Sequence, residues 1–192
     1  MEVIIIHGSK TYLNGSQWIR RLSYKIASCF SEEVPSFNYV YKFKNYLQRK
    51  GIKAEVFRWS GNIGLSDIKE ASKRLNKILV KKKKVILFGK SNGGLISQFS
   101  AMKNEEKILK IVQVGTPNLS KNYAGNIPLV NIYSNSDKMQ RNGIILYSAL
   151  RFKRGSRKLF GEQVKNIVMN LNNHKDFNHK KIFDFYYKYI IS

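Results

Sequence analysis

The sequence predicts an α/β fold, with a parallel sheet of about six strands and helices on both of its faces. Short, almost wholly apolar runs alternate along the chain with longer segments whose apolar residues recur at helical spacing. Strands that are apolar on both faces are typical of parallel sheets. The length of 192 residues and the 43% content of apolar residues predict one domain, over residues 1–192, with a proper core.

The strands are predicted where four to seven mostly apolar residues stand together. These runs cover residues 2–6, 53–59, 85–88, 109–114, 129–133 and 164–169. The helices are predicted over residues 16–28, 37–50, 66–80, 93–102 and 179–190. Gly51 ends the second helix as a C-cap glycine would. The segment 138–161 allows either a helix followed by a basic loop or a longer irregular connection.

One predicted helix has a clear amphipathic pattern. Ser66 and Asp67 open it, and a single apolar stripe follows. The stripe consists of Ile68, Ala71, Leu75, Ile78 and Leu79. We expect this stripe to pack on one face of the sheet.

The third strand runs directly into a Gly-x-Ser-x-Gly motif and then into a helix, which is the setting of a nucleophile elbow. A serine on so sharp a turn needs neighbours without a β-carbon, and Gly89 and Gly93 flank Ser91 at the required spacing. An ordinary glycine-rich turn is the alternative. A phosphate-binding loop is disfavoured because Lys84 occupies the position that needs its first glycine.

A serine nucleophile needs a histidine base and an acid that orients the base. Asp137 follows the fifth strand, and His174 follows the sixth. Parallel strands bring these positions to the same edge of the sheet as Ser91. The alternatives are a turn-forming Asp137 and an exposed loop histidine at position 174. Asp176 is a fallback acid, but it lies only two residues from the histidine that it would have to orient.

The reaction of such a serine also needs two backbone N–H donors for the developing oxyanion. We expect one from Asn92, the residue after the nucleophile, and the other from Ser9, in the loop after the first strand. Gly8 permits that tight turn. His7 is expected to form structural hydrogen bonds rather than to take part in catalysis.

Together these residues resemble the α/β-hydrolase superfamily, in its small lipase- and esterase-like branch. The resemblance spans nearly the whole chain, and the elbow is its most specific part. It rests on residues 3–8, 59–62, 89–94 and 115–117, and then on Asp137 and His174. The sheet starts at the strand that carries the oxyanion loop, as in a minimal member of the superfamily.

The resemblance implies hydrolysis of carboxylic esters or thioesters through an acyl-enzyme, without a metal or organic cofactor. Ser91 would attack, His174 would move the proton, and Asp137 would hold the imidazole. The chain departs from many such lipases at Lys90, where a histidine commonly precedes the nucleophile, and at Asn118, after the Thr-Pro pair. These departures leave lipase, esterase and thioesterase open, and they also allow a non-acyl substrate.

The formal net charge of +23 offers a second interpretation. A basic protein of this fold could bind an anionic lipid surface or nucleic acid with little or no catalysis. No aromatic-basic motif supports nucleic acid, which nevertheless stays open. Lys81–Lys84 should lie at the edge opposite the active site. A candidate anion-binding rim lies between the acid and the base and comprises Arg151, Lys153, Arg154, Arg157 and Lys158.

The low cysteine content is typical of proteins from reducing compartments. Cys29 is the only cysteine, which excludes a disulfide framework within the chain. The start of the chain does not resemble a signal peptide, and no apolar run reaches the length of a membrane span. We therefore expect a cytoplasmic protein that acts on a small-molecule or lipid ester.

Overall fold

The computed structural model describes residues 1–9, 38–62, 64–151 and 155–192. Six strands form one sheet in the order β2-β1-β3-β4-β5-β6, and every neighbouring pair is parallel. The strands are β1 (Glu2–Ile6), β2 (Lys53–Phe57), β3 (Val85–Lys90), β4 (Ile108–Val114), β5 (Leu129–Tyr133) and β6 (Val164–Val168). The predicted fold class and the six parallel strands are thus confirmed.

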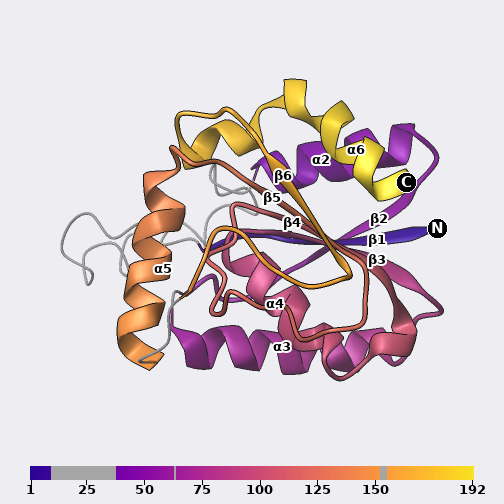
Figure 1. The fold of residues 1–192 in the computed structure, drawn as a ribbon. Coiled ribbons are helices and arrows are strands. Elements are labelled where there is room, and N and C mark those ends of the chain that lie inside the picture. Colours follow the sequence, from indigo (N-terminus) through magenta and orange to yellow (C-terminus); the bar gives the residue numbers. More distant parts are fainter. Residues whose placement is uncertain (10–37, 63, 152–154) are drawn as a thin grey trace, which may run out of the picture.

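Helices cover both faces of this sheet (Figure 1). Helices α2 (Asn38–Arg49) and α6 (Phe183–Ile191) lie on one face, and α3 (Leu65–Leu79) and α4 (Asn92–Ala101) lie on the other. Helix α5 (Lys138–Arg151) stands beside the edge at which the strands end. The described residues also form the short 3-10 helices η2 (Glu105–Lys107), η3 (His174–Asn178) and η4 (Lys180–Ile182).

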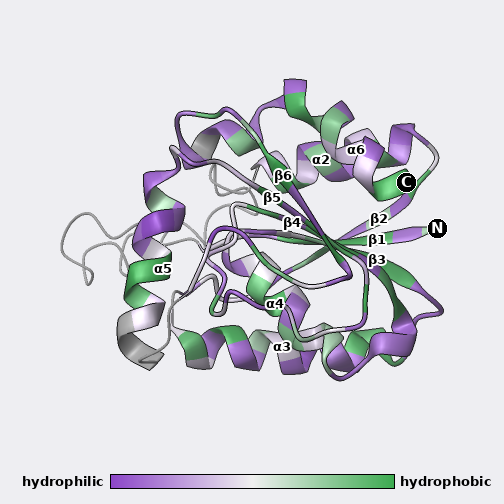
Figure 2. Ribbon diagram, in the orientation of Figure 1, coloured by the Kyte–Doolittle hydropathy of each residue, from purple (hydrophilic) through white to green (hydrophobic). Residues whose placement is uncertain are grey.

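Alternate residues of each central strand supply two separate cores. Val3 of β1 and Phe88 of β3 pack with α2 and α6, whereas Ile4 and Leu87 pack with α3 and α4. The hydropathy colouring shows apolar strands between helices whose outer faces are polar (Figure 2). Burial on both faces explains why these strands appear in the sequence as unbroken apolar runs.

Several predicted boundaries need correction. Ile78 is 38% exposed and does not belong to the buried stripe of α3, whereas Ser72 is buried on that helix. The strand predicted over residues 85–88 continues through Lys90, because Gly89 and Lys90 still pair with Gln113 and Val114 of β4. The last helix begins at Phe183, since the preceding residues form η4. The helix predicted over residues 16–28 lies outside the described residues.

The segment 138–161, which the sequence left open, contains α5 and then a loop with two isolated bridges to residues 118 and 122. In the part of the chain that the structure describes, no helix is long and apolar enough to cross a membrane.

Candidate active site

Ser91 occupies the turn between β3 and α4 with φ 51° and ψ −125°. Among the described residues it is the only one other than glycine with a positive φ. Its backbone N–H donates to the carbonyl of Val114, 2.8 Å away on the neighbouring strand. A non-glycine residue in this conformation is strained, and such strain is typical of functional turns.

The glycines around this turn are required by close backbone contacts. A β-carbon on Gly93 would lie 2.2 Å from the carbonyl oxygen of Ile6, and one on Gly89 would lie 2.6 Å from the Gly93 carbonyl. A β-carbon on Gly94 would meet Thr116 Oγ1 at 2.0 Å. The elbow therefore packs directly on the backbone of β1 and on the segment after β4, which leaves no room for larger residues.

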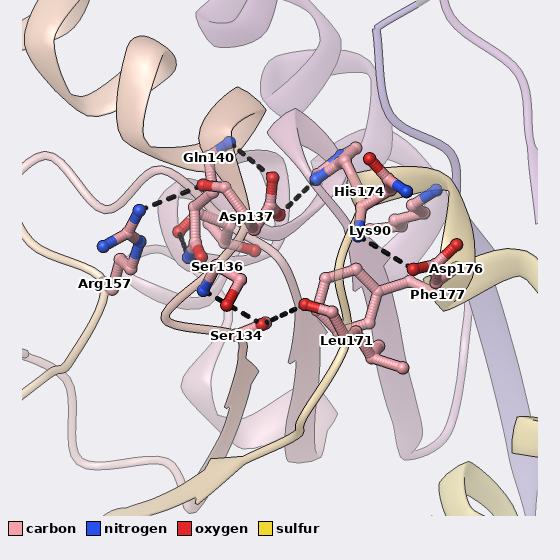
Figure 3. A network of polar contacts seen from close by, with 12 residues as sticks. Lys90, Ser134, Ser136, Asp137, Gln140, Arg157, Leu171, His174, Asp176 and Phe177 are labelled. Carbon is pink, nitrogen blue, oxygen red and sulfur yellow. Dashed lines mark hydrogen bonds and ion pairs between the residues drawn. The ribbon is translucent and has the colours of Figure 1, made fainter.

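Asp137 and His174 come together at the same edge of the sheet (Figure 3). Nδ1 of His174 lies 2.6 Å from Oδ2 of Asp137, and the two side chains are 7% and 0% exposed. The second oxygen of Asp137, Oδ1, accepts the backbone N–H of Gln140 at 2.9 Å. Both oxygens of the buried carboxylate thus have donors, as a buried charge requires.

The pKa values of this pair keep the acid ionised and the base neutral near pH 7. Burial alone would raise the pKa of Asp137, but the hydrogen bond and charge of His174 and the backbone donors of Gln140 and Met139 hold it below its usual value. Burial lowers the pKa of His174, and the charge of Lys90 lowers it further, against the opposing effect of Asp137. A neutral imidazole that donates from Nδ1 to Asp137 leaves Nε2 as an acceptor.

The loops that carry the acid and the base are tied to each other. Ser134 Oγ donates to the carbonyl of Leu171 at 2.7 Å and so joins the loop after β5 to the loop after β6 (Figure 3). Asp176 instead forms a capping box with Asn173, whose backbone N–H it accepts at 2.8 Å. The side chain of Asp176 therefore holds the start of η3, and it is Asp137 that contacts His174.

The imidazole of His174 lies against Gly115, in the turn that follows β4. A β-carbon on Gly115, the residue after Val114, would lie 2.9 Å from Cε1 of His174, and one on Gly8 would lie 2.9 Å from Cβ of Ser91. The described contacts include no hydrogen bond between Ser91 Oγ and His174 Nε2. Catalytic contacts of this kind are commonly loose before substrate binds.

The two residues proposed as oxyanion donors are linked through the side chain of Asn92. Its Nδ2 donates to Ser9 Oγ at 2.7 Å and to Tyr147 Oη at 2.8 Å. Burial raises the pKa of Tyr147 to about 12, against the opposing effect of Asn92, so the phenol stays protonated. The sequence did not indicate a role for Tyr147. It lies in the segment 138–161, whose structure the sequence left open, and no motif there points to a contact with the elbow.

His7 has the structural contacts expected of it. Its ring stacks on Trp59 at a centroid distance of 5.5 Å, and its carbonyl accepts the indole N–H of Trp59 at 3.0 Å. The imidazole thus helps to fix the first strand against the segment after β2.

Buried amides connect the sheet to the loop that contains Arg157. Gln113 Nε2 donates to Asn131 at 2.8 Å, and Asn131 Nδ2 donates to Asn166 at 2.9 Å and to the Arg157 carbonyl at 2.8 Å. The guanidinium of Arg157 in turn donates to the backbone carbonyl of Asp137 at 3.0 Å (Figure 3). Arg157 therefore supports the loop that bears the acid, besides any role at a rim.

Of the other residues of the predicted rim, the structure describes only the side chain of Lys158. Lys158 is exposed and lies over the ring of Phe160 at 5.3 Å. Lys153, Arg154 and the side chain of Arg151 lie outside the described residues. In the opposite basic cluster, Lys82 is paired with Glu2 and Glu55 at 2.6 and 2.7 Å.

Among the described residues, no group of three or more His, Cys, Asp or Glu side chains lies close enough together to hold a metal ion.

Comparison with known proteins gives a likeness of fold rather than of sequence. No family model and no curated protein sequence matches the chain. The esterase from Exiguobacterium antarcticum superposes with a TM-score of 0.61 at 11% identity, over 100% of this chain and 92% of that one. Alpha/beta hydrolase domain-containing protein 10 from mouse gives a TM-score of 0.60 at 16% identity, over 98% and 87%.

The monoacylglycerol lipase of Paleococcus ferrophilus gives a TM-score of 0.60 at 13% identity, over 99% of this chain and 92% of that one. The three superpositions span nearly all of the chain. The chain therefore has the fold of the α/β-hydrolase superfamily, as the sequence resemblance implies.

Proposed function

We propose that this chain, an α/β-hydrolase in fold, is a serine hydrolase that cleaves carboxylic ester or thioester bonds. Ser91 is the nucleophile, His174 the general base and Asp137 the residue that orients the base. The observation that carries the proposal is one combination: a serine at φ 51° and a buried His174–Asp137 pair 2.6 Å apart at the same sheet edge. A strained serine next to an oriented neutral imidazole is the arrangement that acyl transfer needs.

The reaction follows from the protonation states of these groups. In the proposed first step, Nε2 of His174 takes the hydroxyl proton of Ser91 as Oγ attacks the carbonyl carbon. The imidazolium then gives that proton to the leaving alcohol or thiol, and the acyl group stays on Ser91. A water molecule attacks the acyl carbon with His174 again as the base, which releases the acid and regenerates the serine.

The developing oxyanion is stabilised by the backbone N–H groups of Asn92 and Ser9 in this proposal. The two hydrogen bonds of the Asn92 side chain support it, because they hold the loop after β1 against the elbow and against α5. Backbone donors that are already held in place do not have to move during the reaction, so they stabilise the charge of the transition state effectively.

A panel of p-nitrophenyl esters with acyl chains of increasing length tests the proposal. We expect turnover by the wild type and a loss of several orders of magnitude in kcat for Ser91→Ala and for His174→Ala. Ser97→Ala is a matched control, since Ser97 is a buried serine of α4 whose hydroxyl donates only to the Gly93 carbonyl. No turnover by any form, or equal turnover by wild type and Ser91→Ala, would overturn the assignment.

A basic hollow gives some support to the alternative of binding to an anionic surface. The hollow has a volume of about 570 Å³, and its lining combines three cations and two amides without a carboxylate: Lys42, Arg49, Lys180, Asn45 and Gln48. Co-sedimentation with anionic and neutral vesicles at two salt concentrations separates the alternatives. Binding that requires anionic lipid and falls with salt supports this role, whereas equal binding to both vesicles contradicts it.

A further inference from the structure

Lys90 is a buried lysine directly before the proposed nucleophile. It is 6% exposed, and its side chain leaves β3 on the same face as Phe88, the face that α2 and α6 cover. Nζ donates to Oδ1 of Asn178 and lies 4.8 Å from the ring centroid of Tyr39. Burial of an ammonium group is costly, and no carboxylate forms an ion pair with this one among the described residues.

The hydrogen bond to Asn178 joins two parts of the active site. Asn178 is the last residue of η3, the short helix that begins at His174, and Lys90 is the last residue of the strand that leads to Ser91. The bond therefore connects the segment that carries the base to the strand that carries the nucleophile. A separate hydrogen bond ties η3 to α6, since the hydroxyl of Tyr186 donates to the Phe177 carbonyl at 2.8 Å.

We propose that Lys90 is a positioning residue for His174: its buried ammonium group holds η3, the short helix that begins at His174, against β3 through Asn178. The inference rests on the proposed function, in which His174 must be neutral to accept the serine proton. A buried cation near a second titratable group disfavours a second positive charge there. Burial has the same effect, so the two causes act in one direction.

The charged and titratable groups around the imidazole come from several elements. Asp137 from the loop before α5 raises the pKa of His174, and Lys90 from β3 lowers it. Around Lys90 itself lie Tyr39 of α2, Asp137 and Asn178. Asp176 faces the backbone of Asn173 instead, and Tyr186 faces the carbonyl of Phe177.

The sign of the effect depends on the charge of Lys90 when the imidazole titrates. Burial lowers the pKa of Lys90 to about 7, partly opposed by Asp137. In the pH range below that value, where His174 takes up its proton, Lys90 is charged and opposes the protonation. Lys90 therefore extends the active, neutral form of His174 to lower pH.

The test is an NMR titration of the His174 imidazole in the intact protein, with the signal assigned through its loss in His174→Gln. We expect Lys90→Met and Lys90→Gln both to raise the pKa of His174. The glutamine variant keeps a donor for Asn178 without the charge. Lys110→Met is the matched control, since Lys110 is a partly buried lysine on β4 whose Nζ donates to the Tyr189 carbonyl at 3.2 Å.

A parallel measurement of kcat/KM against pH gives the catalytic readout. The acidic limb should move to higher pH in both Lys90 variants. At a fixed pH on that limb, kcat/KM should fall about tenfold for every pH unit by which the limb has moved. Asn178→Ala keeps the charge of Lys90 but removes its hydrogen bond to η3. We therefore expect this variant to lower kcat, and its acidic limb to lie closer to that of the wild type than the limbs of the two Lys90 variants do.

An unchanged His174 titration in folded Lys90→Met and Lys90→Gln would overturn the inference. So would an equal rise of the His174 pKa in Lys110→Met. Because the NMR titration needs no turnover, it stays informative even if the ester panel shows that Ser91 is not a nucleophile. Failure of the proposed function and failure of this inference are therefore separate results.

Discussion

The imidazole of His174 and the carboxylate of Asp137 form a buried hydrogen bond of 2.6 Å between residues 37 positions apart in the chain. The two loops that carry them follow the neighbouring parallel strands β5 and β6, and these two strands end at the same edge of the sheet. The Ser134–Leu171 hydrogen bond locks the loops together. The pair is thus held by backbone geometry before any substrate is present.

Replacement of Asp137 by asparagine should cost more in kcat than in KM. An amide at this position can present its NH₂ group to Nδ1, which favours the wrong tautomer of His174 and removes the charge that stabilises the imidazolium. By analogy with a serine protease triad, we expect kcat to fall on the order of a thousandfold or more. Steady-state kinetics on a p-nitrophenyl ester measure this. A loss of less than about tenfold would show that the carboxylate does not support the base.

Asn92→Ala tests the link between the elbow and the loop after β1. The substitution keeps the backbone N–H of residue 92 but removes both side-chain bonds, to Ser9 and to Tyr147. We expect kcat to fall roughly tenfold or more because the second oxyanion donor loses its support. Tyr147→Phe keeps the bond to Ser9 and should lose less. A larger kcat loss in Tyr147→Phe than in Asn92→Ala would contradict this arrangement.

Gly93→Ala should prevent normal folding of the elbow. The new β-carbon would lie 2.2 Å from the Ile6 carbonyl oxygen and 2.7 Å from that of His7, and backbone atoms of a central strand cannot move aside. Chemical denaturation should show a loss of several kcal/mol or no cooperative transition. Gly51→Ala is the control: with φ 76° but open space around it, it should cost only about 1–2 kcal/mol. Similar losses in the two variants would refute the steric argument.

Lys90→Met should change how stability depends on pH. Burial lowers the pKa of Lys90 from its usual 10.5 to about 7. Between these values the unfolded chain holds a proton that the folded chain has lost, so the free energy of unfolding of the wild type gains from rising pH. Below pH 7 the full penalty of the buried charge applies.

We therefore expect Lys90→Met to be more stable than the wild type at pH 6, with a difference that shrinks as the pH approaches 10. Urea denaturation of both forms at several pH values measures the difference. A constant difference across this range would show that the ammonium is not desolvated as its burial indicates.

The fold could be predicted from the sequence because a parallel sheet covered on both faces needs strands that are apolar throughout. Residues 2–6 and 129–133 are two such runs. The sequence also placed Ser91, Asp137 and His174 after three strands, so the parallel arrangement alone brings them to one edge. The prediction that Ile78 is buried was wrong because the buried face of α3 is turned toward Ser72, which is polar, and away from Ile78.

Other features had no sequence signal. Lys90 resembles a loop residue in the sequence, yet it is a buried strand position, and charge patterns do not reveal an ammonium that burial has enclosed. The amides Gln113, Asn131 and Asn166 likewise interrupt apolar strands, and only the three-dimensional pairing shows that they satisfy one another.

The most direct test of the central claim is the site of a covalent label. The protein is treated with a fluorophosphonate at pH 8 and digested with trypsin, and the peptide of residues 91–103 is examined by mass spectrometry. We predict one adduct, on Ser91, and its strong reduction in His174→Ala. An unlabelled Ser91 in the folded wild type, or an adduct that forms equally in Ser91→Ala, would contradict the account.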